Sequence, residues 1–147
     1  MTDQDGRHVT TPTLDAAPPI PAGALCWRRA FPGRPDQAAP IRRFVGCLLT
    51  GSPHADDAVQ AVAELAANAV QHTRSAAPGG LVVVDVRRWR GGAAVSITDQ
   101  GGPDEPCIAD LDAYAEHGLG LRLVAATAAW WCWRGDDTGR TVTALFV

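Results

Sequence analysis

The sequence predicts an α+β fold, a two-layer sandwich in which helices cover one face of a mostly antiparallel, mixed sheet. Three observations lead to this prediction. Apolar residues recur at three- and four-residue steps in two early segments, β-branched runs flank a central Gly-Gly pair, and two short apolar runs end the chain. With 147 residues, of which 46% are apolar, the chain can form one core, and a second domain is not expected.

The chain begins with a segment whose composition is typical of irregular structure. Residues 1–22 are rich in Pro, Thr, Asp and Gln, a mixture that cannot bury enough apolar surface to fold by itself. We therefore expect a disordered tail over residues 1–22 and one folded domain over residues 23–147. An edge strand is predicted at the start of this domain, over residues 25–31, because prolines follow it closely.

Two amphipathic helices are predicted next. Asp36 is the expected N-cap of the first, which carries apolar residues at helical spacing until the Gly-Ser-Pro sequence at 51–53 breaks it. The same breaker marks the start of the second helix, where Asp56 and Asp57 suit the positive end of the helix dipole. The apolar face expected for this helix consists of Val59, Val62, Ala63, Ala66, Ala69, Val70 and Thr73.

A β-hairpin is predicted in the middle of the domain, where the runs 81–86 and 93–99 flank a Gly-Gly pair. Side chains alternate between the two faces of a strand, so Asp99 shares a face with Val95 and Ile97 if the strand continues through it. A carboxylate on this core-facing side requires a hydrogen-bond partner, because burying an unpaired charge is costly.

The last third of the chain combines a lid-like segment, a helix and two strands. Residues 103–117 lack periodicity and stand between two glycine-containing segments, which is typical of a lid over a ligand. A third helix is expected from about residue 120 to residue 127. Strands are predicted over residues 131–133 and 141–147, with a glycine-containing turn between them.

Charge and cysteine content argue against several classes of protein. The formal net charge is -3 and no cluster of Lys and Arg forms a basic stripe, so we expect no nucleic-acid partner. The sequence has no run of about eighteen apolar residues, so no membrane association is expected. Four cysteines without C-x-x-C spacing favour reduced thiols in a cytoplasmic protein.

Three polar signatures occur in order along the chain. Glu64, Asn68 and His72 are four residues apart in the second predicted helix, so they form one inclined stripe. The sequence Asp-Gln-Gly-Gly at 99–102 follows the hairpin, and Gly-Leu-Gly-Leu at 118–121 leads into the third helix. A carboxylate, an amide oxygen and backbone amides open to close approach are the groups that a nucleotide and its divalent ion require. The three signatures together predict a nucleotide pocket.

The order of these motifs, followed by a Gly-x-Thr-Val strand at 139–142, resembles the ATP-binding domain shared by DNA gyrase, heat-shock protein 90, histidine kinases and the mismatch-repair protein MutL. Over residues 25–147 the sequence is most similar to the compact anti-sigma-factor serine kinases of Gram-positive bacteria. The resemblance implies a Bergerat-type fold that binds ATP and phosphorylates an anti-anti-sigma protein on serine or threonine. It also implies a sigma factor as a second partner, and it is compatible with a homodimer.

The resemblance further implies a role for each motif residue. Glu64 corresponds to the general base, and Asn68 to the ligand that holds Mg²⁺ against the triphosphate of ATP. Asp99 corresponds to the acceptor for the adenine amino group, Gly101 lets the backbone approach the base, and Thr141 assists in adenine binding. The remaining residues assigned to the nucleotide are His72, Gly118, Leu119, Gly120 and Leu121.

Each of these assignments has an ordinary structural alternative. Glu64 could be an exposed helix glutamate, Asp99 could open a turn after a strand, and His72 could be a structural histidine. The glycines of the third signature could serve only to close a loop. For the chain as a whole, the alternative to a kinase is a non-catalytic module in which the nucleotide sets the shape of a protein-binding surface.

Overall fold

The computed structural model describes residues 18–103 and 119–147. Most of the predicted tail, nearly all of the predicted lid and Gly118 lie outside the described residues. The elements in chain order are β1 (Leu25–Pro32), the 3-10 turn η1 (Pro35–Gln37), α1 (Ala38–Leu48), α2 (Ala55–His72), the 3-10 turn η2 (Arg74–Ala76), β2 (Leu81–Trp89), β3 (Gly92–Asp99), α3 (Leu119–Thr127), β4 (Trp130–Asp136) and β5 (Gly139–Phe146).

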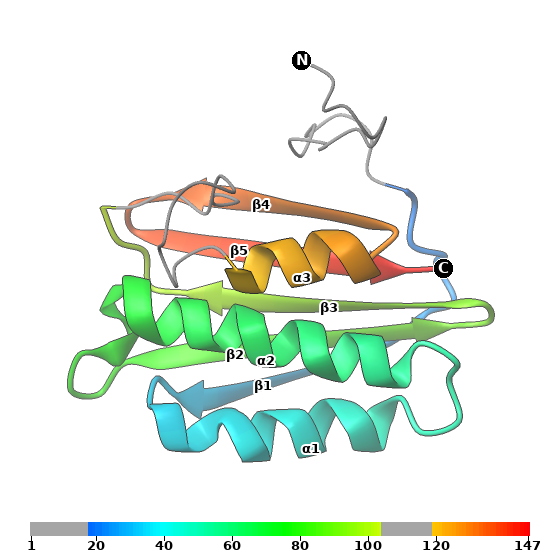
Figure 1. The fold of residues 1–147 in the computed structure, drawn as a ribbon, viewed down its shortest axis with the longest axis horizontal. Helices are drawn as coiled ribbons and strands as arrows, with labels where there is room; N and C mark the ends of the chain where they lie inside the picture. The colour runs from blue at the N-terminus through cyan, green and yellow to red at the C-terminus, as the bar shows by residue number, and fades with distance from the viewer. Residues whose placement is uncertain (1–17, 104–118) are drawn as a thin grey trace.

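The strands form a single sheet with the order β1-β2-β3-β5-β4, and the three α-helices lie together on one of its faces (Figure 1). The predicted α+β two-layer sandwich is therefore confirmed. The expected mixed character is not observed, because every neighbouring pair of described strands is antiparallel. The reason lies in the connections. Two hairpins join β2 to β3 and β4 to β5, and the α1–α2 pair returns the chain to the end of β1, where Pro32 pairs with Leu81.

The start of α1 differs from the prediction. Asp36 does not cap this helix, because it lies in the preceding turn η1, where its Oδ1 accepts hydrogen bonds from Arg34 Nε at 3.1 Å and Gln37 Nε2 at 3.3 Å. The N-cap of α1 is Gln37, which makes no side-chain capping bond. Pro40 falls in the first turn of α1, where a missing N–H costs no hydrogen bond within the helix.

The helix α2 packs its small residues against the sheet. Its buried residues are Ala58, Ala61, Val62, Leu65, Ala66 and Ala69. Val59, Ala63 and Val70, which were expected on this face, are only half-buried and lie at its borders. Alanines at the contact allow a close approach of the helix backbone to β3.

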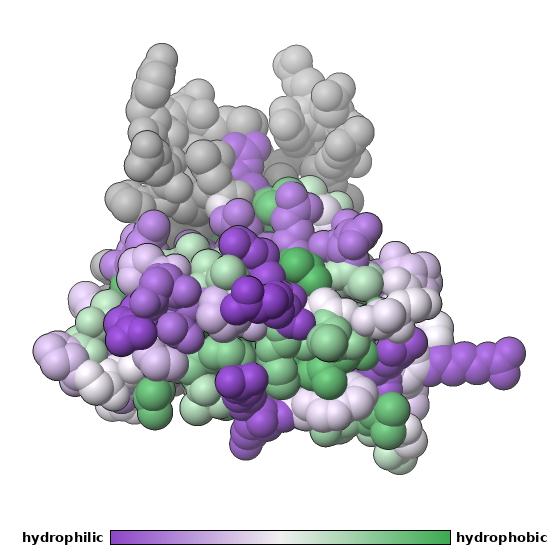
Figure 2. Space-filling model, turned by 90° about the horizontal axis from the view of Figure 1, so that it is seen from below, coloured by the Kyte–Doolittle hydropathy of each residue, from purple (hydrophilic) through white to green (hydrophobic). Residues whose placement is uncertain are grey.

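The core lies between the helices and the sheet. Its largest fully buried side chains include Phe31 of β1 and Phe146 of β5, and Trp131 of β4 belongs to the same cluster. The surface on the side of α1 and β1 alternates apolar groups with strongly hydrophilic ones (Figure 2). A small cavity of about 130 Å³ lies at this side between α1 and α2, and Ile41 and Val70 are among its lining residues. Within the described part of the chain, no helix is both long and apolar enough to cross a membrane.

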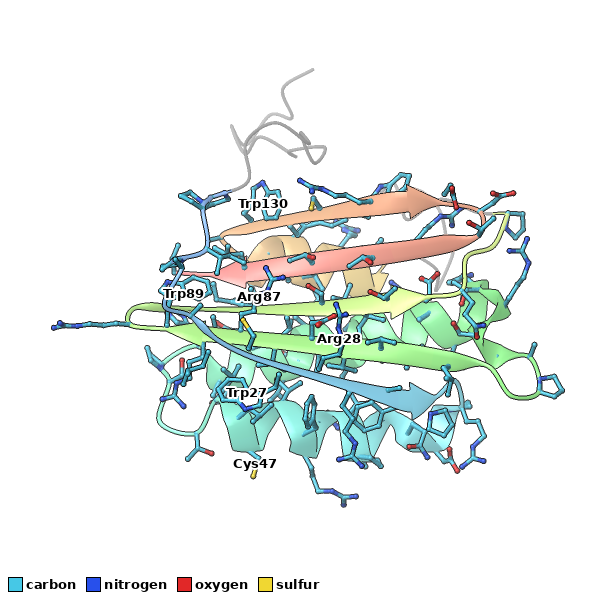
Figure 3. All side chains as sticks on the ribbon, turned by 180° about the vertical axis from the view of Figure 1, so that it is seen from behind. Trp27, Arg28, Cys47, Arg87, Trp89 and Trp130 are labelled. Atoms are coloured by element: carbon cyan, nitrogen blue, oxygen red, sulfur yellow. The ribbon has the colours of Figure 1, made fainter. Side chains whose placement is uncertain are left out.

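The other face of the sheet carries polar side chains, and none of the described helices covers it (Figure 3). Arg28 of β1 forms an ion pair with Asp85 of β2 on this face, with 2.7 Å between Nε and Oδ1. A hydroxyl pair joins β3 to β5, with 2.8 Å between the Oγ1 atoms of Thr98 and Thr141. Cross-strand polar pairs therefore stabilise this face, whereas apolar burial stabilises the covered one.

Candidate functional site

The first signature lies on α2 at the border of its buried face. Glu64, Asn68 and His72 are all half-buried, next to the buried row of Ala61 and Leu65. A half-buried polar stripe has access to solvent and also to the groups of neighbouring elements. The elements beside α2 on this side are α3 and the end of β3 (Figure 1).

The third signature meets the first through Gly120, the second residue of α3. A Cβ atom added to Gly120 would lie 2.7 Å from Oε2 of Glu64 and 3.2 Å from its Cβ. A side chain at position 120 would therefore require the Glu64 carboxylate to move away from the first turn of α3. The free N–H groups of a helix N-terminus attract anions, so the structure places a carboxylate and a phosphate-binding type of element side by side.

The second signature begins with a buried carboxylate at the end of β3. Asp99 is 8% exposed and faces the helices together with Val95 and Ile97, as the alternation of the strand predicts. Its Oδ1 accepts a hydrogen bond from the N–H of Gly101 at 2.7 Å, which is the partner that burial requires. Burial raises the pKa of Asp99 above its usual value, whereas the N–H of Gly101, the charge of Arg140 and the main-chain N–H of Arg140 oppose this rise.

The loop after Asp99 is fixed between two other parts of the molecule. Gly101 has φ +75°, and a Cβ atom there would lie 2.2 Å from the carbonyl oxygen of Asp137 in the β4–β5 turn. A Cβ atom at Gly102 would lie 2.6 Å from the carbonyl oxygen of His72. The N–H of Arg74 donates to the carbonyl of Gly101 at 2.8 Å. The second signature is thus brought to the C-terminal end of α2, where the first signature ends.

Thr141 is not brought to this group. It lies on the uncovered face of the sheet, where its hydroxyl pairs with that of Thr98, because neighbouring residues of a strand point to opposite faces. The residue opposite Asp99 in the β3–β5 register is Arg140, which is 5% exposed and whose Nη2 donates to the carbonyl of Gly102 at 2.7 Å. Sequence reasoning missed Arg140, although its alternation with the apolar Val142 was a signal that it faces the helices.

The other residues of the third signature have different positions. Gly118 lies outside the described residues, and Leu119 is the first residue of α3. Leu121 is 3% exposed and belongs to the hydrophobic core, so its side chain stabilises the packing of α3. Any contact of Leu121 with a nucleotide would have to come from its main chain.

The described residues include the types of oxygen-bearing group that bind nucleotides and magnesium ions. Mg²⁺ bound to phosphates keeps several waters and needs only one or two protein oxygens, so a single half-buried amide such as Asn68 is sufficient. Glu64 supplies a carboxylate beside the first turn of α3, and Asp99 supplies a buried acceptor at the other end of the stripe. Within the described residues, no group of three or more His, Cys, Asp or Glu side chains could hold a metal ion by itself.

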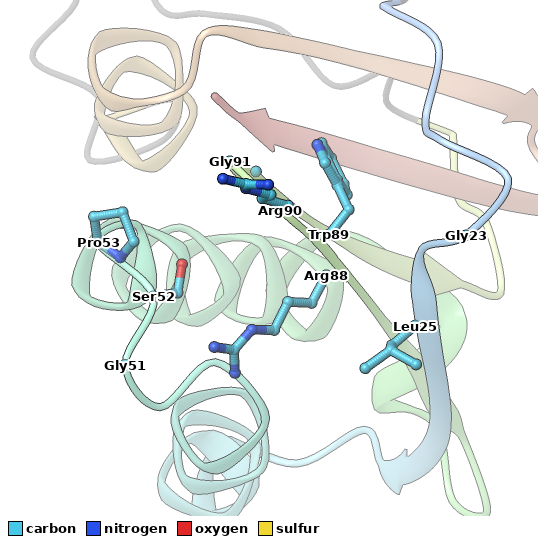
Figure 4. Close-up of a pocket in the computed structure, with 10 residues that line it drawn as sticks. Gly23, Leu25, Gly51, Ser52, Pro53, Arg88, Trp89, Arg90 and Gly91 are labelled. Carbon is cyan, nitrogen blue, oxygen red and sulfur yellow. The ribbon is translucent and has the colours of Figure 1, made fainter.

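A larger cavity, of about 440 Å³, lies at the other end of the sheet, beside the β2–β3 turn and the α1–α2 connection (Figure 4). None of the three signatures lines it. Arg88 reaches across it and donates through Nη1 to the carbonyls of Leu48 and Thr50, at 3.0 Å each. This arginine satisfies carbonyl groups at the C-terminal end of α1, so its position has a structural explanation.

Comparisons with known proteins agree with the observed fold. In the solved structure of the RsbU and RsbW domains of Rv1364c from Mycobacterium tuberculosis, the match covers 83% of this chain and 32% of that one, with 19% identity and a TM-score of 0.62. The chain thus spans about a third of that protein. The structure of the SiaB-SiaC complex from Pseudomonas aeruginosa matches 83% of this chain and 88% of that one, with 18% identity and a TM-score of 0.54. At these identities the two structures show the fold alone.

A search of the curated proteins found no match. The family model of the histidine kinase-like ATPase domain matches residues 31–146, which include all three signatures and all the described helices and strands from the end of β1 onward. The chain therefore belongs to the histidine kinase-like ATPase domain family.

Proposed function

We propose that this protein is an ATP-dependent regulatory kinase that phosphorylates an anti-anti-sigma protein on serine or threonine and that also binds and silences a sigma factor. The observation that carries the proposal is the contact between Gly120 and Glu64. It joins a candidate base to the start of a helix that can bind phosphate, in a chain of the histidine kinase-like ATPase family.

Each residue has a distinct role in the proposed reaction. Asp99 accepts a hydrogen bond from the amino group of adenine, which favours ATP over GTP because guanine presents a carbonyl oxygen at that position. When it is bound with ATP, Mg²⁺ neutralises part of the negative charge on the transferred phosphoryl group. Asn68 holds this ion through its amide oxygen.

Glu64 acts on the protein substrate. Its carboxylate accepts the proton of the serine or threonine hydroxyl while the hydroxyl oxygen forms a bond to the γ-phosphorus of ATP. The bond between this phosphorus and the bridging oxygen breaks, and ADP leaves with the electron pair. The first-turn amides of α3, beside Glu64, favour the negative charge of the phosphates.

Two of the comparisons support a protein partner. The Pseudomonas aeruginosa structure is that of a SiaB-SiaC complex, so a chain of this fold is found there with a second protein. The Mycobacterium tuberculosis structure joins an RsbU and an RsbW domain in one chain. We infer that this protein also acts on a partner, of the anti-anti-sigma class, and that it has no nucleic-acid or membrane partner.

A transfer assay tests the proposal. Purified protein is incubated with Mg²⁺, ATP labelled at the γ-phosphate, and each anti-anti-sigma protein of the same organism. We expect label on a serine or threonine of one of them, and we expect Glu64→Gln to reduce the transfer rate by about 100-fold or more with ATP affinity retained. The matched control is Asp57→Asn, which removes an exposed carboxylate from the same helix and should leave the rate unchanged.

The outcomes separate the two classes of function. ATP binding without transfer to any partner, with Glu64→Gln equal to the original protein in every assay, would contradict the kinase and favour the non-catalytic module. No binding of ATP at all would contradict both. Calorimetric titration with ATP and with GTP in the presence of magnesium provides this measurement.

A further inference from the structure

A buried arginine with an incomplete set of hydrogen bonds lies beside Asp99. Arg140 is 5% exposed, and arginine is rarely buried this far unless its charge has a use or a partner. Its Nη2 donates to the carbonyl of Gly102 at 2.7 Å, and its guanidinium lies 5.8 Å from the ring centroid of Trp133. Its Nε is enclosed and has no hydrogen-bond partner among the described residues. A buried unpaired donor costs stability, so this position requires an explanation.

The side chain of Arg140 lies near Asp99 without forming an ion pair with its carboxylate. The two residues are partners in the β3–β5 register and face the same side of the sheet. The ion pairs between described residues are Arg28–Asp85 and Arg34–Asp36, so Arg140 and Asp99 form none. The positive charge therefore acts on Asp99 through space, and the carboxylate keeps acceptor capacity for a ligand.

Arg140 also fixes the loop that follows Asp99. Its bond to Gly102 fixes one side of this loop, and the N–H of Arg74 fixes the other through the carbonyl of Gly101. The Oγ of Ser75 accepts the N–H of Gln100 at 3.0 Å. Three consecutive residues of the loop are thus each bound to another element, and Arg140 is the only one of these three partners that lies on the sheet.

We propose that Arg140 is the positioning residue of the adenine site: its side chain holds the loop 100–102 against the end of β3 and places a positive charge beside Asp99 without forming an ion pair with its carboxylate. This inference rests on the proposed function, because it assigns a role in base recognition. It gives a reason for a buried arginine whose hydrogen bonds are incomplete, since its charge is used as well as its donors.

The charges around Asp99 agree with this role. Burial raises the pKa of Asp99, and a protonated carboxyl is a weaker acceptor for the adenine amino group than a carboxylate. The charge of Arg140 lowers this pKa. Among the described residues, the other titratable or charged residues at this corner include Arg74 of η2, His72 at the end of α2, Asp136 at the end of β4 and Asp137 in the turn.

The test is a titration of the Asp99 carboxyl in the protein without nucleotide. The carboxyl ¹³C chemical shift of Asp99 is followed against pH by nuclear magnetic resonance, in the original protein and in Arg140→Gln. We expect the midpoint to rise by about one pH unit in Arg140→Gln, because a nearby positive charge is removed. An unchanged midpoint would overturn the proposal.

Two further variants make the test specific. Arg134→Gln removes an exposed arginine from β4 that pairs with Thr141 and lies on the other face of the sheet, so it should leave the midpoint unchanged. Arg140→Lys keeps the charge, and its midpoint should stay within about 0.3 pH units of the original. Arg140→Lys decides by itself if Arg140→Gln does not fold, because a rise of a full unit with the charge retained would overturn the proposal.

ATP affinity measured against pH separates this inference from the proposed function. We expect the affinity of the original protein to fall at acid pH with the midpoint of Asp99, and we expect this fall to begin at a higher pH in Arg140→Gln. Normal ATP binding with an unchanged Asp99 midpoint in Arg140→Gln would overturn only the role of Arg140. A shifted Asp99 midpoint in a protein that binds no ATP would overturn the proposed function.

Discussion

Gly120 of α3 packs directly against the side chain of Glu64 of α2, and an added Cβ atom would lie 2.7 Å from Oε2 of that glutamate. The two residues are far apart in the sequence, and helix packing brings them together. Because Glu64 is the candidate base and Gly120 lies in a first helical turn that can bind phosphate, this contact is where a small structural change should affect function most.

Gly120→Ala should separate activity from stability. Alanine is the better helix former by about 1 kcal/mol, which offsets the crowding against Glu64, so we expect unfolding free energy within about 1 kcal/mol of the original. Phosphate transfer should fall by at least about tenfold, because Glu64 must move. Urea unfolding and the transfer assay measure the two quantities. A large loss of unfolding free energy together with the loss of transfer would contradict this expectation.

Gly46→Ala provides the matched control in α1. A Cβ atom there would meet Val59 Cγ2 at 3.6 Å, which is an ordinary van der Waals contact. We expect this variant to be more stable by about 0.5–1 kcal/mol, because alanine loses less conformational entropy than glycine in a helix. Thermal unfolding measures this difference, and transfer activity should not change.

Gly101→Ala should destabilise the domain more than Gly91→Ala. Both glycines have positive φ, +75° and +87°, but only at Gly101 would a Cβ atom meet backbone, 2.2 Å from the carbonyl oxygen of Asp137. The φ value costs an L-residue about 1–2 kcal/mol at either position. The additional clash at Gly101 should bring its loss to about 3 kcal/mol or more. Equal losses in urea unfolding would show that the loop moves away without cost.

Thr141→Val should leave ATP binding unchanged. The hydroxyl of Thr141 forms a hydrogen bond with Thr98 on the uncovered face of the sheet. Its removal should lower the free energy of unfolding by about 1 kcal/mol and leave the affinity for ATP unchanged. Asp99→Asn should lower ATP affinity by about tenfold or more, because one of the two acceptor oxygens becomes an NH2 donor and the remaining acceptor has no charge. Calorimetry compares the two variants. A larger loss in Thr141→Val would contradict the placement of Thr141 away from the base.

We expect the burial of Asp99 to lower the free energy of unfolding as the pH rises above the ordinary pKa of an aspartate. Its pKa is raised in the folded protein from 3.8, chiefly by burial, so between the unfolded and folded pKa values the native state binds more protons than the unfolded state. Stability from this group is present at low pH and is lost as the pH rises through the folded pKa. The loss is about 1.4 kcal/mol for each pH unit by which the pKa is raised.

The measurement for this pH dependence is urea unfolding of Asp99→Asn and of the original protein at pH 3 and pH 7. The variant has no charge to bury, so its stability relative to the original protein should increase between the two pH values. A difference that stays constant or decreases would show that the hydrogen bond and the nearby charge outweigh the burial of Asp99.

The sequence by itself determined the features that depend on local periodicity. The spacing of apolar residues located α2, and the alternation of β3 placed Asp99 on the core face with Val95 and Ile97, because both patterns repeat within a few residues. The order of the three signatures was sufficient to identify the ATPase family. The N-cap of α1 was mispredicted at Asp36, since a short turn intervenes and element boundaries depend on contacts outside the helix.

Only the tertiary structure decided which residues meet. Arg140 and Thr141 are adjacent in the chain, and the register between β3 and β5 selects Arg140 as the neighbour of Asp99 and turns Thr141 to the other face. The contact of Gly120 with Glu64 likewise depends on how α3 packs against α2. Pairing and packing arise between segments distant in sequence. Alternation within β5 indicates which of its side chains face the helices, but it does not say which residue of β3 lies opposite each of them, because that depends on the register between the two strands.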